Sequence, residues 1–162
     1  MKKLTALVLT LALTLSLSVT AFAAEITDQD GSPKDTTVEI TTSIEPTYTV
    51  TIPANTTVAF NATSTSFGSI KLDAAQLDPG YAVKVELSAS NTLKNKADAD
   101  KTIAYTIKDG NGVFTSAEYL TAGDSTALTI DITQAAWDAA YAGEYSDTVT
   151  FTVSYVETGV TP

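Results

Sequence analysis

The sequence predicts an all-β protein, an antiparallel β-sandwich of about seven to eight strands with at most one short helical turn. The first observation is an alternation of apolar and polar residues, which recurs between residues 38 and 157. The second is the turn-forming chemistry between the alternating runs, for example at Asp78–Gly80 and Asp109–Gly112. The third is the abundance of threonine, a β-branched residue that favours strands. Because each run has one apolar face, we expect antiparallel strands in two sheets whose apolar faces pack together.

Each run places an apolar side chain at every second residue. In chain order, the apolar positions are Val38, Ile40 and Ile44; Tyr48, Val50 and Ile52; Val58 and Phe60; Ile70 and Leu72; Tyr81, Val83, Val85 and Leu87; Ile103, Tyr105 and Ile107; Leu128, Ile130 and Ile132; and Val149, Phe151, Val153 and Tyr155. Pro46 and Pro53 end the first two runs, because proline cannot donate to a strand ladder. One helical turn is expected over residues 134–141, capped by Thr133 and stopped by Gly143.

The first 23 residues have the features of a secretory signal peptide of bacterial type. Lys2 and Lys3 precede an apolar stretch, and Ala21 and Ala23 occupy the small-residue positions of a cleavage site. We therefore expect residues 1–23 to be removed and the protein to be secreted, either released or held non-covalently at the cell surface.

Three further parts are expected after the cleavage site. Residues 24–37 are polar and predict a flexible N-terminal arm, residues 38–157 the sandwich, and residues 158–162 a short tail. No second apolar stretch of about 20 residues follows, so we expect no membrane span in the mature protein.

The composition argues against several classes of function. The chain has no His and no Cys, so Ser-His-Asp catalysis, thiolate chemistry, disulfides and zinc sites are not expected. All nine basic residues are lysines and the net charge is −10, which disfavours nucleic-acid binding. No phosphate-binding loop and no Ser-x-x-Lys motif is present. We therefore expect a protein that is not an enzyme and that has no cofactor.

Three acidic loops leave two interpretations open. They lie at residues 28–31, 98–100 and 109–111, and each is either a solvated turn or a weak extracellular Ca²⁺ site. The first begins like an EF-hand loop but lacks the Glu at the twelfth position.

A motif late in the chain leads into the last alternating run. Ala142-Gly143-Glu144-Tyr145 resembles the tyrosine corner of immunoglobulin-like sandwiches, in which a Tyr hydroxyl bonds to nearby backbone. Tyr145 occupies the position of that structural corner residue. Asp147 stands two residues on, where true immunoglobulin domains have a Cys.

The same segment resembles bacterial secreted β-sandwiches of the spore coat protein U and archaic pilin type. The matching positions are Gly143, Tyr145, Asp147, Thr148, Val149, Thr150, Thr152, Val153 and Tyr155. The resemblance implies that this strand is the penultimate one and that an N-terminal arm of the next subunit fills an exposed groove. Such a head-to-tail contact need not close, and it gives filaments. Residues 38–44 alternate correctly for this insertion; the alternative is that they pair within their own domain.

Aromatic residues beside this motif offer a second kind of site. Trp137 and Tyr141 are candidates for a ligand platform on which sugar rings stack, and the alternative is that Trp137 plugs one end of the sandwich. The favoured function is a secreted structural or adhesive protein, a fimbrial or coat subunit that assembles by strand exchange with itself or with related surface subunits. The second candidate function is a module that binds a glycan or host ligand through the loop aromatics.

Overall fold

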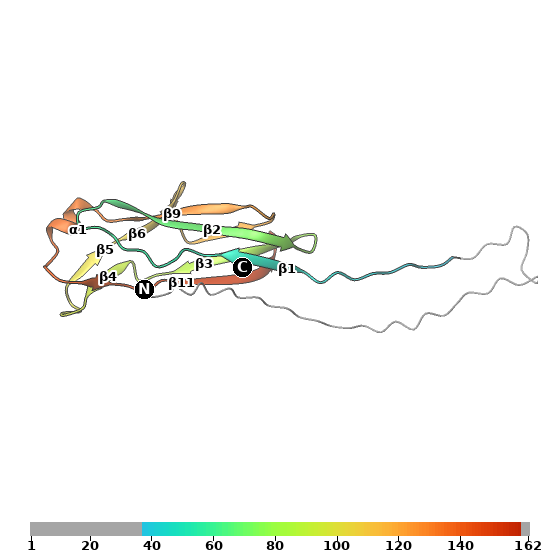
Figure 1. The fold of residues 1–162 in the computed structure, drawn as a ribbon, viewed down its shortest axis with the longest axis horizontal. Helices are drawn as coiled ribbons and strands as arrows, with labels where there is room; N and C mark the ends of the chain where they lie inside the picture. Colours follow the sequence, from blue (N-terminus) through green and yellow to red (C-terminus); the bar gives the residue numbers. More distant parts are fainter. Residues whose placement is uncertain (1–36, 160–162) are drawn as a thin grey trace, which may run out of the picture. The chain divides into compact units, whose positions relative to one another are not determined.

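Two layers of antiparallel strands form the sandwich (Figure 1). The computed structural model describes residues 37–159. The predicted signal peptide, the predicted arm apart from Thr37, and residues 160–162 of the tail lie outside the described residues. The chain divides between Glu45 and Pro46, so residues 37–45 are described by themselves.

One layer is a five-stranded sheet with the order β1–β2–β9–β6–β7. Its strands are β1 (Thr47–Thr51), β2 (Ser64–Gln76), β9 (Ser125–Asp131), β6 (Thr106–Asp109) and β7 (Gly112–Val113). Every pair of neighbours in this sheet is antiparallel.

The facing layer consists of two three-stranded sheets, with the orders β11–β3–β8 and β10–β4–β5. Its strands are β11 (Thr150–Glu157), β3 (Tyr81–Ser88), β8 (Ser116–Tyr119), β10 (Tyr145–Ser146), β4 (Thr92–Asn95) and β5 (Thr102–Ala104). The helix α1 (Gln134–Asp138) lies at one end of the sandwich, here called the α1 end (Figure 1).

The core lies between the layers and is closed most completely where β2 and β9 face β3. Ile70 and Leu72 of β2, Val83 and Val85 of β3, and Leu128 of β9 are almost wholly buried. Burying one such aliphatic side chain contributes roughly 1.5–3 kcal/mol, so these contacts are the main source of the fold's stability.

The predicted fold class is confirmed: the chain is an all-β, antiparallel sandwich with one short helix. The described residues form eleven strands rather than seven or eight. One reason is that the predicted run at 103–107 divides at Tyr105, where the chain passes from β5 in one layer to β6 in the other. Other strands, such as β7 and β10, have only two residues each, too few to show alternation in the sequence.

Two alternating runs do not form strands. Residues 38–44 belong to no strand, and neither does the predicted run at Val58 and Phe60, which lies in the unpaired segment 52–60. Pro53 lacks the N–H that a ladder needs. At the end of the second segment, Asn61 has a φ of 60°, and the Ala62 N–H donates to the Ala59 carbonyl at 3.1 Å, so the chain turns there.

The helix begins where the sequence predicts and ends earlier. The Thr133 hydroxyl accepts from the Ala136 N–H at 3.2 Å, which makes Thr133 the N-cap. The helix ends at Asp138, before the predicted Tyr141, and Ala139 is its C-cap. Within the described part of the chain, no helix is long and apolar enough to cross a membrane.

Candidate functional site

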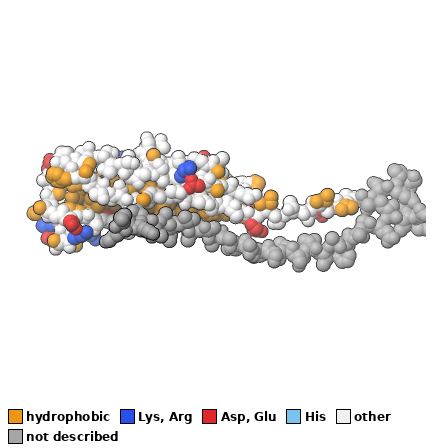
Figure 2. Space-filling model, in the orientation of Figure 1, with side chains coloured by type: hydrophobic (Ala, Val, Ile, Leu, Met, Phe, Trp, Pro, Cys, Tyr) orange, Lys and Arg blue, Asp and Glu red, His pale blue; other side chains and the backbone are white. Residues whose placement is uncertain are grey.

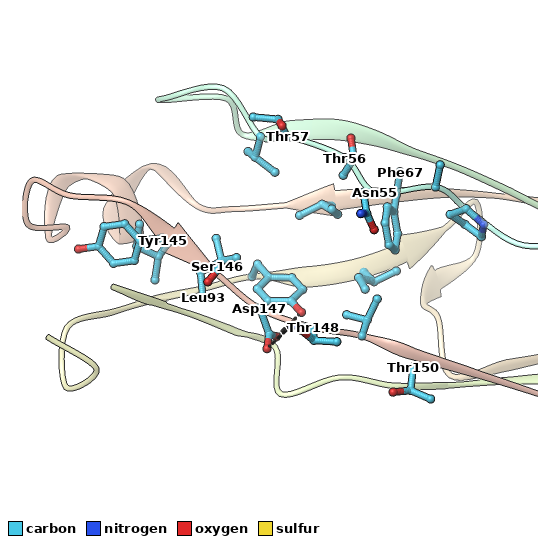
Figure 3. A pocket seen from close by; sticks show the side chains of 18 of the residues that line it. Asn55, Thr56, Thr57, Phe67, Leu93, Tyr145, Ser146, Asp147, Thr148 and Thr150 are labelled. Carbon is cyan, nitrogen blue, oxygen red and sulfur yellow. Dashed lines mark hydrogen bonds between the residues drawn. The ribbon is translucent and has the colours of Figure 1, made fainter. Parts of the chain in front are cut away.

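A groove of about 890 Å³ opens between the two layers toward the α1 end (Figure 3). One wall is residues 52–60, which follow β1, and the other is residues 145–151, which lead from β10 into β11. Between these walls lie apolar side chains from both layers, namely Phe67, Leu93, Ile103, Ile107 and Ile130. Leu93 is half-buried, whereas the other four side chains are buried, so the groove lies directly over the core without exposing it deeply.

Neither wall has a complete ladder. β10 and β11 are edge strands, because β10 pairs only with β4 and β11 only with β3 among the described strands. Residues 147–149, between β10 and β11, belong to no strand, and neither do residues 52–60 on the opposite wall. An edge strand presents a row of N–H and C=O groups that another extended chain can pair with.

The groove ends where β1 closes the gap between the layers. Phe67 and Phe151 meet across the layers at this inner end, with ring centroids 6.0 Å apart. Beyond them, the Tyr48 ring of β1 stacks on the Tyr155 ring of β11, with centroids 6.1 Å apart and planes at 23°. Tyr155 stacks in turn on Tyr81 at 4.9 Å. The open part of the core is thus confined to the segment that follows β1.

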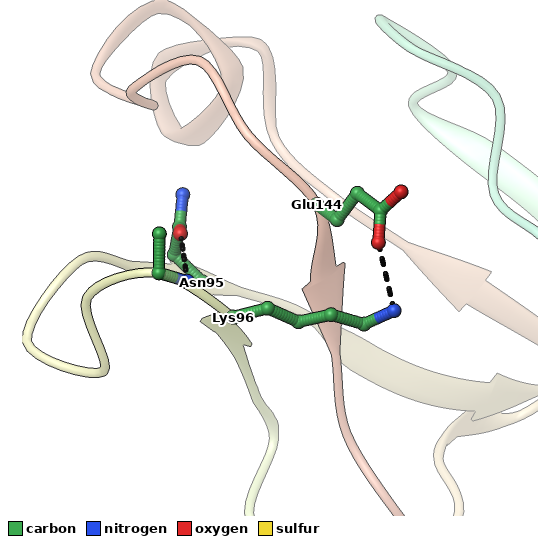
Figure 4. Close-up of polar contacts among 4 residues, drawn as sticks. Asn95, Lys96 and Glu144 are labelled. Atoms are coloured by element: carbon green, nitrogen blue, oxygen red, sulfur yellow. Dashed lines mark hydrogen bonds and ion pairs between the residues drawn. The ribbon is translucent and has the colours of Figure 1, made fainter.

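The segment 142–146, which leads into the wall 145–151, is fixed to the neighbouring strand β4 (Figure 4). Asn95 is buried, and its Nδ2 donates to the Ala142 carbonyl at 3.4 Å. The Lys96 N–H donates to the Glu144 carbonyl at 2.8 Å, and the Lys96 ammonium pairs with the Glu144 carboxylate at 2.8 Å. Gly143 has a φ of 145°, and a Cβ there would collide with the Asn95 side chain, so this close approach requires glycine.

A polar pair stands among the apolar residues of the groove. The Tyr105 hydroxyl donates to Asp147 Oδ2 at 2.6 Å, and the Ser90 hydroxyl donates to the same oxygen at 2.7 Å. The Thr148 N–H donates to Asp147 Oδ1 at 2.8 Å. Both carboxylate oxygens therefore have partners within the chain, and the pair holds the segment between β10 and β11 against Tyr105.

The pKa values of this pair follow from burial and hydrogen bonding. Burial by itself raises the pKa of Asp147, but the hydrogen bonds from Tyr105 and Ser90 outweigh it, and the pKa lies below its usual value. Burial, together with the hydrogen bond to Asp147, raises the pKa of Tyr105 well above its usual value. At neutral pH Asp147 is therefore ionised and Tyr105 is neutral, the states that their hydrogen bond requires.

The three aromatic residues singled out in the sequence lie together at the α1 end. The Tyr145 hydroxyl donates to the Tyr141 carbonyl at 2.9 Å, the bond that defines a tyrosine corner. Trp137 is half-buried, and its indole N–H donates to the Ala62 carbonyl at 3.0 Å. Tyr141 is 63% exposed, and the Lys101 ammonium lies 4.6 Å from the centroid of its ring.

A second hollow of about 360 Å³ lies among these aromatic residues. It shares Phe60, Trp137 and Tyr145 with the main groove, so it lies beside the groove's α1 end. Phe60 is 79% exposed, and its ring meets the Trp137 ring edge-on, with centroids 5.7 Å apart. Trp137 therefore packs against protein on several sides, while Phe60 and Tyr141 are presented to solvent.

The carboxylates of two acidic loops form hydrogen bonds to backbone within their own turns. Asp98 accepts from the Asp100 N–H at 3.1 Å, and Asp109 accepts from the Asn111 and Gly112 N–H groups at 2.7 and 2.9 Å. Among residues 37–159, no group of three or more Asp or Glu side chains is placed to hold a metal ion. The third predicted loop, residues 28–31, lies outside the described residues.

Sequence reasoning missed most of the groove itself. The sequence predicts a strand run at Val58 and Phe60, whereas residues 52–60 form an unpaired wall, and Phe60 is largely exposed instead of lying in the core. A signal was present: Pro53 is followed by Asn55, Thr56 and Thr57, an interruption of the alternation next to the proline.

No protein-family model matches the chain, and no curated protein matches it.

Proposed function

We propose that the protein is a secreted, non-enzymatic structural or adhesive subunit that assembles outside the cell by strand exchange. In this proposal the groove receives residues 38–44 of a second copy, or the equivalent segment of a related surface subunit. Residues 38–44 continue the predicted N-terminal arm and are called the arm from here on. The observation that carries the proposal is the groove: a hollow between the layers, lined by apolar residues and flanked by an edge strand that has no partner on that side among the described strands. Adding an extended segment to such an edge is a recurring mode of recognition, with backbone hydrogen bonds for affinity and pockets for alternate side chains.

The chain itself carries a segment of the right kind. Val38, Ile40 and Ile44 are 71%, 94% and 64% exposed, and they share one parity. In an extended segment they therefore point to one side, while Glu39 and Thr41 point to the other. Residues 38–44 and the wall 145–151 both span seven residues, about 23 Å at 3.3 Å per residue. The segment thus matches the wall in length and offers its apolar side chains to the groove.

The energies are of the right order for a regulated association. Burying three aliphatic side chains contributes roughly 5–9 kcal/mol at 1.5–3 kcal/mol each. Association costs an estimated 4–15 kcal/mol in lost translational and rotational freedom. Side-chain burial alone is therefore close to break-even, and stable assembly depends on the added backbone ladder and on contacts between the subunit bodies.

Other features agree with an extracellular subunit. The N-terminal sequence has the basic, apolar and small-residue parts of an export signal. The net charge of −10 keeps separate copies apart in solution until a specific contact forms.

The test is a comparison of two neighbouring substitutions in the mature chain, residues 24–162. Ile40→Lys places a charge on the parity that enters the groove, and Thr41→Lys places the same charge on the opposite parity. We expect multi-angle light scattering to show concentration-dependent oligomers for the unmodified chain and for Thr41→Lys, and monomers for Ile40→Lys. Monomers for all three chains, or equal association of all three, would refute strand exchange through this segment.

A second candidate function is glycan or host-ligand binding, which the hollow beside Trp137 and Tyr141 favours. Exposed aromatic rings can stack on sugar rings, and Tyr141 is the more exposed of the two. Because Trp137 is engaged with Ala62 and Phe60, Tyr141→Ala is the cleaner test. If the unmodified chain binds a glycan on an array and Tyr141→Ala does not, while both associate equally, the binding module is favoured over the assembling subunit.

A further inference from the structure

We infer that the α1 end of one copy docks directly against the opposite end of the next copy, with Phe60 and Tyr141 as the main contacts. This inference rests on the proposed function, because it concerns the body of the subunit whose arm occupies the groove. The partner is a second copy of this chain, and the contact surface is the exposed aromatic pair beside the α1 end of the groove.

The length of chain between arm and body forces the two bodies into contact. Only Glu45 and Pro46 separate Ile44, the last apolar residue of the inserting segment, from Thr47, the first residue of β1. Three residue steps at about 3.3–3.6 Å each allow roughly 10 Å between the α-carbons of Ile44 and Thr47. The folded body of the donating copy must therefore begin where its arm leaves the groove.

The shape of the groove selects the end from which the arm leaves. At the inner end, the stacked rings of Tyr48 and Tyr155 close the gap between the layers. At the other end, the groove reaches the hollow between Phe60 and Tyr145. An arm that runs antiparallel to residues 145–151 has its N-terminal part beside Phe151 and its C-terminal part at the α1 end. The chain therefore leaves the groove at the α1 end, where there is room for a second body.

The two surfaces that meet when the arm leaves at the α1 end are suited to a contact. The α1 end presents Phe60 and Tyr141, and Figure 2 shows hydrophobic side chains gathered at this end of the sandwich. The donating copy presents the end where its β1 begins, which carries the half-buried stack of Tyr48, Tyr81 and Tyr155. Aromatic side chains are enriched at the centres of protein interfaces, and the hollow of about 360 Å³ gives them a recess to enter.

Crosslinking tests the docking directly, because the chain contains no cysteine. Thr47→Cys marks the start of the body and Ala142→Cys marks the rim of the hollow; both positions are exposed and leave the aromatic residues intact. The two mature variants are mixed and treated with a short bis-maleimide. Val113→Cys, an exposed position on β7 that does not line the groove, replaces Ala142→Cys in the matched control. An arm inserted in the reverse direction would leave the groove at its inner end. Ile52→Cys, paired with Thr47→Cys, detects that arrangement, because Ile52 lines the groove at the end of β1.

We expect the Thr47–Ala142 pair to crosslink about tenfold more than the Thr47–Val113 pair. Preferential crosslinking of Thr47 to Ile52, or equal yields for all pairs, would overturn the docking. A second measurement compares the association of three serine variants by light scattering. Tyr141→Ser and Phe60→Ser should each weaken association about tenfold, as loss of an interface anchor does, while Val113→Ser should leave it unchanged.

The outcomes separate this inference from the proposed function. If Ile40→Lys leaves association intact, strand exchange itself fails and the docking fails with it. If Ile40→Lys abolishes association but Tyr141→Ser, Phe60→Ser and Val113→Ser all associate like the unmodified chain, strand exchange stands and the end-to-end docking alone is wrong. Loss of glycan binding by Tyr141→Ser without any change in association likewise counts against the docking.

Discussion

The two halves of the segment 47–60 behave differently although both show apolar alternation. Residues 47–51 form β1, pair with β2 and close the sandwich through the stack of Tyr48 on Tyr155. Residues 52–60 pair with no strand, and they leave the groove open between themselves and residues 145–151. A similar alternation therefore continues a sheet in one half and leaves a groove between the layers in the other.

Local chemistry at the junction accounts for the difference. Pro53 removes a backbone donor directly after β1. Opposite it, β2 has a register irregularity with β9 between Ser66 and Gly68, and Gly68 has a φ of 101°. A Cβ on Gly68 would lie 3.6 Å from the Pro53 Cβ, so the two residues are close neighbours. A proline facing an irregular stretch of β2 ends the pairing and begins the groove.

The largest expected effect comes from the same substitution, Val to Ala, made once in the closed core and once on the groove. Val85→Ala, at a fully buried site, should lower the free energy of unfolding by about 2–3 kcal/mol, from two lost methyl groups and the cavity they leave. Val149→Ala, at a half-buried site on the groove, should lower it by about 1 kcal/mol or less. Urea denaturation of monomeric protein measures both, and equal losses would mean that the core is closed on both sides.

The next effect concerns the polar pair in the groove wall. Tyr105→Phe removes the hydrogen bond to Asp147 and should lower the free energy of unfolding by about 1.5–2 kcal/mol, the scale of a hydrogen bond to a charged group. Tyr141→Phe is the matched control, because its hydroxyl is on an exposed ring, and it should change little. A loss that is the same for both variants would show that the pair does not hold the wall.

The same pair predicts a pH dependence on both sides of neutrality. Because the pKa of folded Asp147 lies below its usual value, its stabilisation is complete above about pH 5 and is lost as the pH falls below about 4. Because the pKa of folded Tyr105 is raised, its contribution is present below about pH 10 and is lost as the pH rises beyond that. Thermal melts from pH 2 to 11 should show that Asp147→Asn reduces the fall in melting temperature at acid pH. Tyr105→Phe should reduce the fall at alkaline pH. Melting temperatures that follow pH as they do in the unmodified chain would contradict this.

The smallest expected change tests the junction itself. Pro53→Thr restores a backbone donor and should alter the free energy of unfolding by less than about 1 kcal/mol, because removal of a proline mainly frees the unfolded chain. Hydrogen exchange should show new protection at residues 53–55. Light scattering should show a weaker association of the mature chain. Unchanged exchange at these amides would mean that the irregular stretch of β2, rather than the proline, ends the pairing.

The fold class and the helix cap could be predicted because they depend on local sequence. The alternation at 81–87 and 149–155 and the Thr133 cap each follow from neighbouring residues, and the structure has β3, β11 and α1 at these places. The groove could not be predicted in the same way, because it depends on which strands do not meet. That Leu93, Ile103 and Phe67 line one open space is a property of the packing of the two layers, which alternation along the chain does not encode.

The most direct test of the central claim adds the arm back as a free peptide. The Ile40→Lys mature chain, whose own arm is disabled, serves as the receiver, and a peptide of residues 36–45 is titrated against it. If the groove accepts this segment, the melting temperature should rise with peptide concentration, because binding to the folded state alone stabilises it by RT ln(1 + [L]/Kd). The same peptide with Ile40→Lys should have no effect. A melting temperature that does not change with either peptide, up to millimolar concentration, would contradict the account.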